Sequence, residues 1–234
     1  MHHVVLDRWS RGRSFLHSCD ARVKIVALLA FLVAVATTPP TAWPAMIGYG
    51  VLAAVAVAAA GLPLGAVLLR ASVVLPLAGT FAVISAISGD AARAWALLGK
   101  SYLSAVAVLV VAGSTPLPRL LRGLEAMGTP RLLVLVVLFI HRYLFVISEQ
   151  VQHMRMAAAC RGRFSRGAAA GALSVLFARS YGRAEAIHRA MIARGFTGSF
   201  PLTTPPATRA ADWAFLAAAV LAVAGVRVML GVSR

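Results

Sequence analysis

Long apolar runs separated by short polar or proline-rich turns dominate the hydrophobic pattern of this chain. A membrane-spanning helix needs about 20 mostly apolar residues. Five runs are predicted to span a membrane, at residues 23–38, 43–60, 66–87, 102–114 and 213–230. Pro39-Pro40 ends the first run, and Pro76 predicts a kink in the third. The polar residues 89–100 read as a loop. The pattern therefore predicts an all-α membrane protein with about five transmembrane helices.

Residues 131–148 form a sixth apolar stretch of a different kind. Its uninterrupted apolar run covers only residues 132–140, and His141-Arg142 follows directly. An arginine at the centre of a spanning helix costs at least about 2.5 kcal/mol. We expect this stretch to lie at the membrane face without crossing, although partial entry into the bilayer stays open.

The charge distribution supports that topology. The chain has 23 Lys and Arg against 7 Asp and Glu, a net charge of +16. Basic residues gather on the cytoplasmic side of membrane proteins. With the N-terminus inside and residues 131–148 not crossing, all but four of the 23 basic residues lie inside; the four exceptions are Arg93, Lys100, Arg227 and Arg234. Topology therefore explains the charge, and a nucleic-acid partner is not expected.

This topology divides the chain into three segments. Residues 1–115 hold the N-terminal tail and four spans, residues 116–200 a largely helical cytoplasmic or interfacial domain, and residues 201–234 a linker and the last span. The N-terminus is expected in the cytoplasm. Cys19 and Cys160 are too few and too far apart for a disulfide or metal framework.

Two short motifs in the basic domain are the most informative residues of the chain: Cys160-Arg161-Gly162 and Ala193-Arg194-Gly195. An arginine followed by glycine is typical of a helix C-terminus, where glycine adopts the left-handed cap. Arginine keeps its charge at neutral pH and offers a rigid fork of donors. Two such tips indicate docking to a partner that is itself present twice.

The segment between the motifs has helical periodicity. Its apolar stripe is predicted to comprise Leu173, Leu176, Phe177, Ser180, Ala184, Ile187 and Met191. Glu185 and Arg189 are spaced for an i,i+4 ion pair. Two interpretations stay open, because periodicity alone does not separate them: a helix on lipid or on the protein's own core, and a helix presented to a partner protein.

Ordered motifs along nearly the whole chain resemble one family, the transmembrane T component of energy-coupling factor transporters, and its cobalt type, CbiQ, most closely. The residues that carry the resemblance are Leu16-His17-x-x-Asp20-x-Arg22-Val23-Lys24, Pro130-Arg131-Leu132-Leu133, Arg142-Tyr143-Leu144-Phe145, Arg179-Ser180-Tyr181 and the two Arg-Gly motifs.

The resemblance implies a subunit without catalysis or a cofactor of its own. In that family two ABC ATPases, which bind the ATP, dock onto two coupling helices that each end in Ala-Arg-Gly. Arg161 and Arg194 would be the docking tips, completed by Gly162, Ala193 and Gly195. Cys160 stands where the motif has alanine, and cysteine is also small and apolar. A membrane S component would bind cobalt, with a small accessory membrane subunit as an optional member. The expected location is the cytoplasmic membrane of a bacterium or archaeon.

Other functions are weighed against this one. Nickel or a vitamin are alternative substrates. A secondary transporter or channel usually carries ionisable groups within its spans, and none of the seven acidic residues lies centrally in a proposed span. A membrane enzyme would need a catalytic constellation that the sequence does not display. Gly99-Lys100-Ser101 lacks the first glycine of a phosphate-binding loop. Met1-His2-His3 could bind Co²⁺ or Ni²⁺, but no further ligands accompany it.

Overall fold

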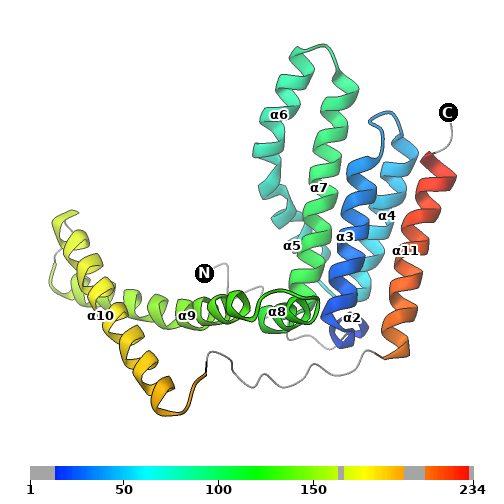
Figure 1. Ribbon diagram of the computed structural model, residues 1–234. Helices are drawn as coiled ribbons and strands as arrows, with labels where there is room; N and C mark the ends of the chain where they lie inside the picture. Colours follow the sequence, from blue (N-terminus) through cyan, green and yellow to red (C-terminus); the bar gives the residue numbers. More distant parts are fainter. Residues whose placement is uncertain (1–13, 163–165, 198–208, 232–234) are drawn as a thin grey trace. The chain divides into compact units, whose positions relative to one another are not determined.

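The structure is a computed structural model that describes residues 14–162, 166–197 and 209–231. Those residues form helices joined by short turns, with no strand among them (Figure 1). The elements are α2 (Phe15–Ser18), α3 (Ala21–Thr37), α4 (Trp43–Ala60), α5 (Leu64–Ala71), η1 (Ser72–Val74), α6 (Leu75–Ile87), α7 (Ala91–Ser114), α8 (Leu117–Ala126), α9 (Arg131–Cys160), α10 (Arg166–Ala193) and α11 (Ala210–Gly231). The all-α fold class is confirmed.

The chain divides into two compact units. The first unit is Met1–Met127 together with Pro205–Arg234, and the second is Gly128–Thr204. The division falls after Met127, so α8 belongs with the first unit's helices, whereas the charge pattern placed residues 116–127 with the basic domain. α8 packs against α3, which explains the difference.

Five segments of the described chain are long and apolar enough to cross a membrane. They are Trp43–Ala60, Leu64–Ile87, Ala91–Ser114, Arg131–Cys160 and Ala210–Met229. The number agrees with the sequence expectation, but the set differs: α9 is included, and α3, with 17 residues, is shorter than the others. A helix of 17 residues is still within the range that spans a bilayer.

α9 is one continuous helix of 30 residues. His141-Arg142 interrupts its apolar run, but no glycine or proline interrupts its backbone, so nothing in the sequence ends the helix. Its length does not decide whether it crosses the membrane, and its position at the membrane face stays a prediction.

In the first unit, α3, α4, α7 and α11 pack around a shared apolar core. Tyr49 is fully buried, and its ring meets Phe31 edge-on at a centroid distance of 5.8 Å. Val35, Val57 and Val106 also belong to this core. α11 thus packs against α3 and α4, although most of the chain lies between them in sequence.

The third predicted span is broken into α5 and α6 by the single 3₁₀ turn η1. Pro76 lies at the start of α6, where its missing N–H costs nothing. The predicted kink is therefore present, immediately before this proline. Both α5 and α6 pack against α7.

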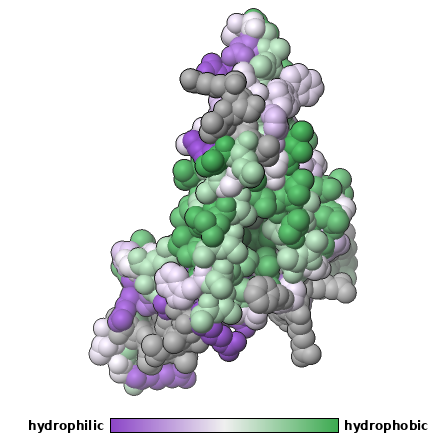
Figure 2. Space-filling view, turned by 90° about the vertical axis from the view of Figure 1, so that its right-hand side faces the viewer, coloured by the Kyte–Doolittle hydropathy of each residue, from purple (hydrophilic) through white to green (hydrophobic). Residues whose placement is uncertain are grey.

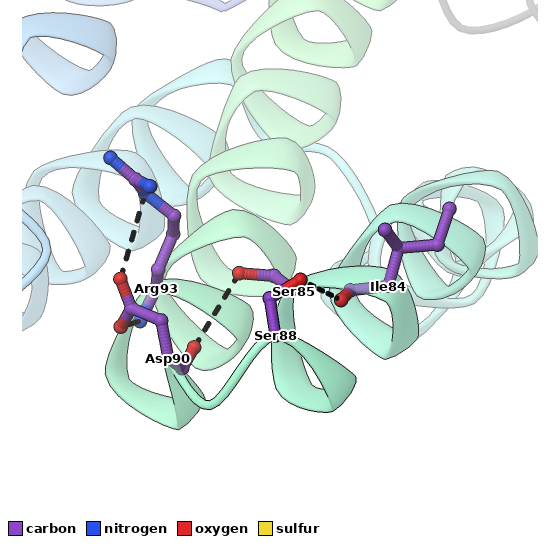
Figure 3. Close-up of polar contacts among 5 residues, drawn as sticks. All are labelled: Ile84, Ser85, Ser88, Asp90 and Arg93. Atoms are coloured by element: carbon purple, nitrogen blue, oxygen red, sulfur yellow. Dashed lines mark hydrogen bonds and ion pairs between the residues drawn. The ribbon is translucent and has the colours of Figure 1, made fainter.

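The polar residues 89–100 are not a loop, and that expectation was wrong. The turn between α6 and α7 contains only Ser88, Gly89 and Asp90 (Figure 3). The Asp90 carboxylate accepts the Arg93 N–H at 3.0 Å and begins α7. Polar residues after an aspartate are compatible with a helix whose first turn is capped in this way.

Two of the four basic residues that broke the positive-inside pattern have a structural role. Lys100 Nζ donates to the backbone oxygens of Ala36 and Thr38, at 3.0 and 2.5 Å. Arg227 donates to Ala34 O at 3.5 Å and to the Thr37 hydroxyl. Both cations therefore cap the C-terminus of α3, where unpaired carbonyls favour positive charge. Arg93 pairs with Asp90 at 3.8 Å (Figure 3), and Arg234 lies outside the described residues.

The outer surface of the first unit is apolar. Side chains on five helices are largely exposed; examples are Val33, Ile47, Leu77, Trp95 and Leu221. Figure 2 shows hydrophobic side chains over the middle of the face that it presents. Exposed apolar surface around a bundle of long helices is typical of contact with lipid. The chain is a multi-pass membrane protein.

Candidate functional site: two arginine-tipped helix ends

The first Arg-Gly motif forms the C-terminus of α9. Cys160 is the last helical residue, Arg161 is the C-cap, and Gly162 adopts a left-handed φ of 64°. The Gly162 N–H donates to Ala159 O at 3.0 Å, and the Arg161 N–H donates to Ala158 O at 3.2 Å. Glycine follows the arginine because a left-handed residue closes this helix end, and glycine adopts that conformation without strain.

The second motif forms the C-terminus of α10 with the same geometry. Ala193 is the last helical residue, and Gly195 has a φ of 76°. The Gly195 N–H donates to Ile192 O at 2.9 Å, and the Phe196 N–H donates to Met191 O at 3.0 Å. These two bonds define a complete Schellman motif. Arg194 therefore occupies the C-cap, as Arg161 does in α9.

All six motif residues are exposed. Neither arginine forms an ion pair with a described residue. Cys160 and Ala193 occupy equivalent positions, one residue before the C-cap. The structure thus presents two equivalent charged helix ends in the second unit, as the sequence predicted for their local geometry.

The predicted apolar stripe of α10 does not act as one face. Leu176, Ile187 and Met191 are partly buried, whereas Leu173 and Phe177 are 67% and 74% exposed. Ile187 and Met191 line a hollow against α9, and Leu176 is not among its lining residues. The stripe was too wide, because helical spacing identifies neighbours on a helix but not which of them meets another helix.

Arg161 also borders a cleft between α9 and α10 that the sequence did not predict. Arg179 and Arg183 of α10 and His153 of α9 line the same cleft. Arg194 is not among its lining residues. The two helix ends therefore differ in their surroundings, although their caps are alike.

A buried polar network in the first unit was also missed. Asp212 lies near the start of α11 and is 6% exposed. Its carboxylate accepts the Arg209 N–H at 2.9 Å and the Asp20 N–H at 3.1 Å. Asp20 in turn caps α3 by accepting the Arg22 N–H at 3.0 Å. One carboxylate therefore joins the N-termini of α3 and α11.

The same end of α3 is joined to α7 and α8. Lys24 is 2% exposed, and its ammonium donates to the Thr115 hydroxyl at 2.7 Å and to Ser114 O at 3.5 Å. Arg119 of α8 donates to His17 O at 3.4 Å. The residues Leu16 to Lys24, which carried part of the resemblance, thus connect α2 and α3 with α7, α8 and α11. The sequence shows that Asp212 is an acidic residue near the start of a helix, but nothing in the sequence links it to Asp20.

Among the residues that the structure describes, no three His, Cys, Asp or Glu side chains gather as a metal site requires. His141 stacks edge-on against Phe145 at 5.3 Å. Met1-His2-His3 lies outside the described residues.

These features define a class: an all-α, multi-pass membrane protein whose second unit presents two arginine-capped helix ends. Comparison with known proteins gives the family. The model of the family described as cobalt transport protein CbiQ matches residues 12–205. The cobalt transport protein CbiQ of Rhodobacter capsulatus is 31% identical over 189 residues, which cover 78% of this chain and 71% of that protein. The chain belongs to the CbiQ cobalt transport protein family. The matched region includes both arginine-capped ends, and α11 lies beyond it.

Proposed function

We propose that this chain is the transmembrane coupling component, or T component, of an energy-coupling factor importer for cobalt. The observation that carries the proposal is the pair of equivalent helix ends, Cys160-Arg161-Gly162 and Ala193-Arg194-Gly195, exposed on a unit separate from most of the apolar helices. Family membership supports the transported ion, since the relative's name specifies cobalt transport.

In this proposal two ABC ATPase subunits dock on the second unit, one at each arginine tip. The left-handed glycine ends the helix directly after the arginine. The C-cap arginine therefore extends from the helix end, and its guanidinium can enter a groove on a partner. ATP is bound and hydrolysed by the partners, and this chain is not catalytic. Movement of the ATPases is transmitted through α9 and α10 to a membrane S component that binds cobalt, with a small accessory subunit as an optional further member.

We propose a cytoplasmic-membrane location with the N-terminus and the second unit inside. The positive-inside rule supports this orientation. The roles of Lys100 and Arg227 as caps of α3 strengthen it, because two of the exceptions to the rule have a separate structural reason. α9 then lies along the inner membrane face, and α3 provides the fifth span.

The test is co-purification with the ATPase and S component subunits expressed from the same genome. Arg161→Glu and Arg194→Glu reverse the charge at each tip. Loss of a buried charge-assisted contact typically costs about 2–5 kcal/mol, so each variant should retain the ATPases at least tenfold less tightly. The double variant should lose more, since distant sites tend to act additively.

Arg189→Glu is the matched control. Arg189 is on α10, five residues before Arg194, and its side chain is 71% exposed. It pairs with Glu185 at 3.8 Å, an exposed contact whose loss costs only a few tenths of a kcal/mol. If Arg189→Glu weakens assembly as strongly as Arg194→Glu, general basicity holds the ATPases and the proposed tips do not. Cobalt uptake by this chain alone, in vesicles without ATPase subunits, would favour a secondary transporter instead.

The substrate retained by the co-purified S component distinguishes cobalt from nickel or a vitamin. If the co-purified S component retains nickel or a vitamin and not cobalt, the coupling role stands and the proposed substrate is wrong.

A further inference from the structure

The cleft between α9 and α10 has a cationic part. The cleft measures about 1060 Å³, and its lining includes Arg161, Arg179, Arg183 and His153. Among the described residues that line it, Glu149 is the single acidic one. Arg179 and Arg183 are exposed, and neither forms an ion pair with a described residue. Three arginines around one hollow, opposed by one carboxylate, attract an anion.

An apolar hollow of about 450 Å³ adjoins this part. Its lining includes Tyr143 and Leu144 of α9 and Ile187 and Met191 of α10. Arg183, together with Val146 and Gln150, borders both hollows. They therefore form one groove, which is cationic toward the end of α9 and apolar toward its middle. We call it the α9–α10 groove.

The apolar part of this groove continues onto the outer face of α9. Leu132, Val136, Ile140 and Leu144 recur at four-residue spacing and are 69%, 47%, 59% and 43% exposed. Ile140 and Leu144 also line the groove. Since residues four apart share one face of a helix, this apolar surface is continuous. On a membrane protein such a surface is suited to contact with acyl chains.

We propose that the α9–α10 groove holds an anionic phospholipid. The phosphate lies between Arg179 and Arg183, which offer planar, fork-shaped donors suited to phosphate oxygens. An acyl chain lies along Tyr143, Leu144 and Ile187. A ligand that is only acidic, such as a segment of another protein, leaves the apolar part of the groove exposed, whereas an anionic lipid fills both parts. This proposal goes beyond the coupling role and does not depend on ATPase docking.

The test uses the purified full-length chain in detergent, with bound lipid counted by native mass spectrometry. Three probes are compared at equal concentrations: dioleoyl phosphatidylglycerol, dioleoyl phosphatidylcholine and inorganic phosphate. The first two share their acyl chains and differ in net charge, and the third has charge without chains. Phosphatidylglycerol should be retained about tenfold more than phosphatidylcholine, and inorganic phosphate should not displace it.

Variants locate the site. A basic residue near an anionic lipid is worth about 1 kcal/mol, or about fivefold in affinity. Arg179→Gln and Arg183→Gln should each lower phosphatidylglycerol retention about fivefold, and Arg183→Lys should keep most of it. Arg189→Gln is the control on the same helix, because Arg189 does not line the groove.

Equal retention of the two lipids, or displacement of phosphatidylglycerol by inorganic phosphate, would overturn the proposal, and neither result depends on a variant. An Arg189→Gln effect as large as that of Arg183→Gln would also overturn it. If Arg179→Gln and Arg183→Gln abolish ATPase co-purification but leave lipid retention unchanged, the groove belongs to a protein interface.

Discussion

Asp212 is predicted to be the most sensitive polar residue of the first unit. Asp212 is 6% exposed, and its carboxylate accepts two backbone N–H groups, one at the start of α11 and one at the start of α3. Asp212→Ala removes both acceptors and leaves two donors without a partner at a buried position. Asp212→Asn keeps one acceptor oxygen and should lose about half as much.

The magnitude follows from the two bonds. A hydrogen bond to a charged group contributes about 1.5–3 kcal/mol, so the loss of two such bonds in Asp212→Ala should cost about 3–6 kcal/mol. The matched control is Asp90→Ala. Asp90 is a helix-capping aspartate as well, but its side chain is 47% exposed and accepts a single backbone N–H, that of Arg93. Loss of an exposed N-cap costs about 1 kcal/mol.

Thermal unfolding of the purified chain in detergent, followed by circular dichroism, measures the difference. For a protein of this size 1 kcal/mol shifts the Tm by about 2–4 °C. Asp212→Ala should lower the Tm by about 10 °C, and Asp90→Ala by about 3 °C. If the two variants shift the Tm equally, the bridge between α3 and α11 adds nothing beyond an ordinary cap, and the reasoning is refuted.

Four further predictions concern other sites. An impermeant maleimide should label the exposed Cys160 in inside-out vesicles and not in intact cells, and labelling in intact cells would mean that α9 crosses the membrane. Cys19 should react only at alkaline pH or after unfolding, because burial raises the pKa of its thiol, with Asp212 adding to the rise and Lys24 opposing it. Gly195→Ala should destabilise the chain by about 1–2 kcal/mol, because the φ of Gly195 is left-handed. Gly182→Ala should stabilise it slightly, because Gly182 is helical with free space around its Cβ position, and equal Tm shifts of the two variants would contradict this. Lys100→Met should lower the Tm by a few degrees through loss of two bonds to the end of α3, and an unchanged Tm would show that this cap contributes nothing.

Local rules predicted much of this fold. The apolar runs identified four of the five described segments that are long and apolar enough to span a membrane. The Arg-Gly pattern identified the ends of α9 and α10, because it depends on neighbouring residues only. The polar residues 89–100 were misread because one aspartate, Asp90, is enough to begin a helix in polar sequence. The apolar stretch 131–148 marked only the first part of α9, because hydropathy does not show where a helix backbone ends.

What the sequence did not reveal depends on tertiary contacts. Asp20 and Asp212 are 192 residues apart, and no periodicity connects them. From the sequence, Lys100 and Arg227 were only exceptions to the positive-inside rule. Their contacts with backbone carbonyls of α3 explain their positions. The groove between α9 and α10 could not be predicted, because the facing side chains of two helices are set by packing.

The central proposal, that the two arginine-capped helix ends contact ATPase subunits, is tested most directly by site-specific cross-linking in the assembled complex. A thiol-reactive photo-cross-linker on the exposed native Cys160 probes the first end, and the double variant Cys160→Ala, Ala193→Cys probes the equivalent position of the second. A probe at position 189, in Cys160→Ala, Arg189→Cys, is the control. The proposal predicts cross-links to an ATPase subunit from both ends and markedly weaker ones from position 189. Absence of ATPase cross-links at both ends, in a complex that still contains the ATPases, would contradict it.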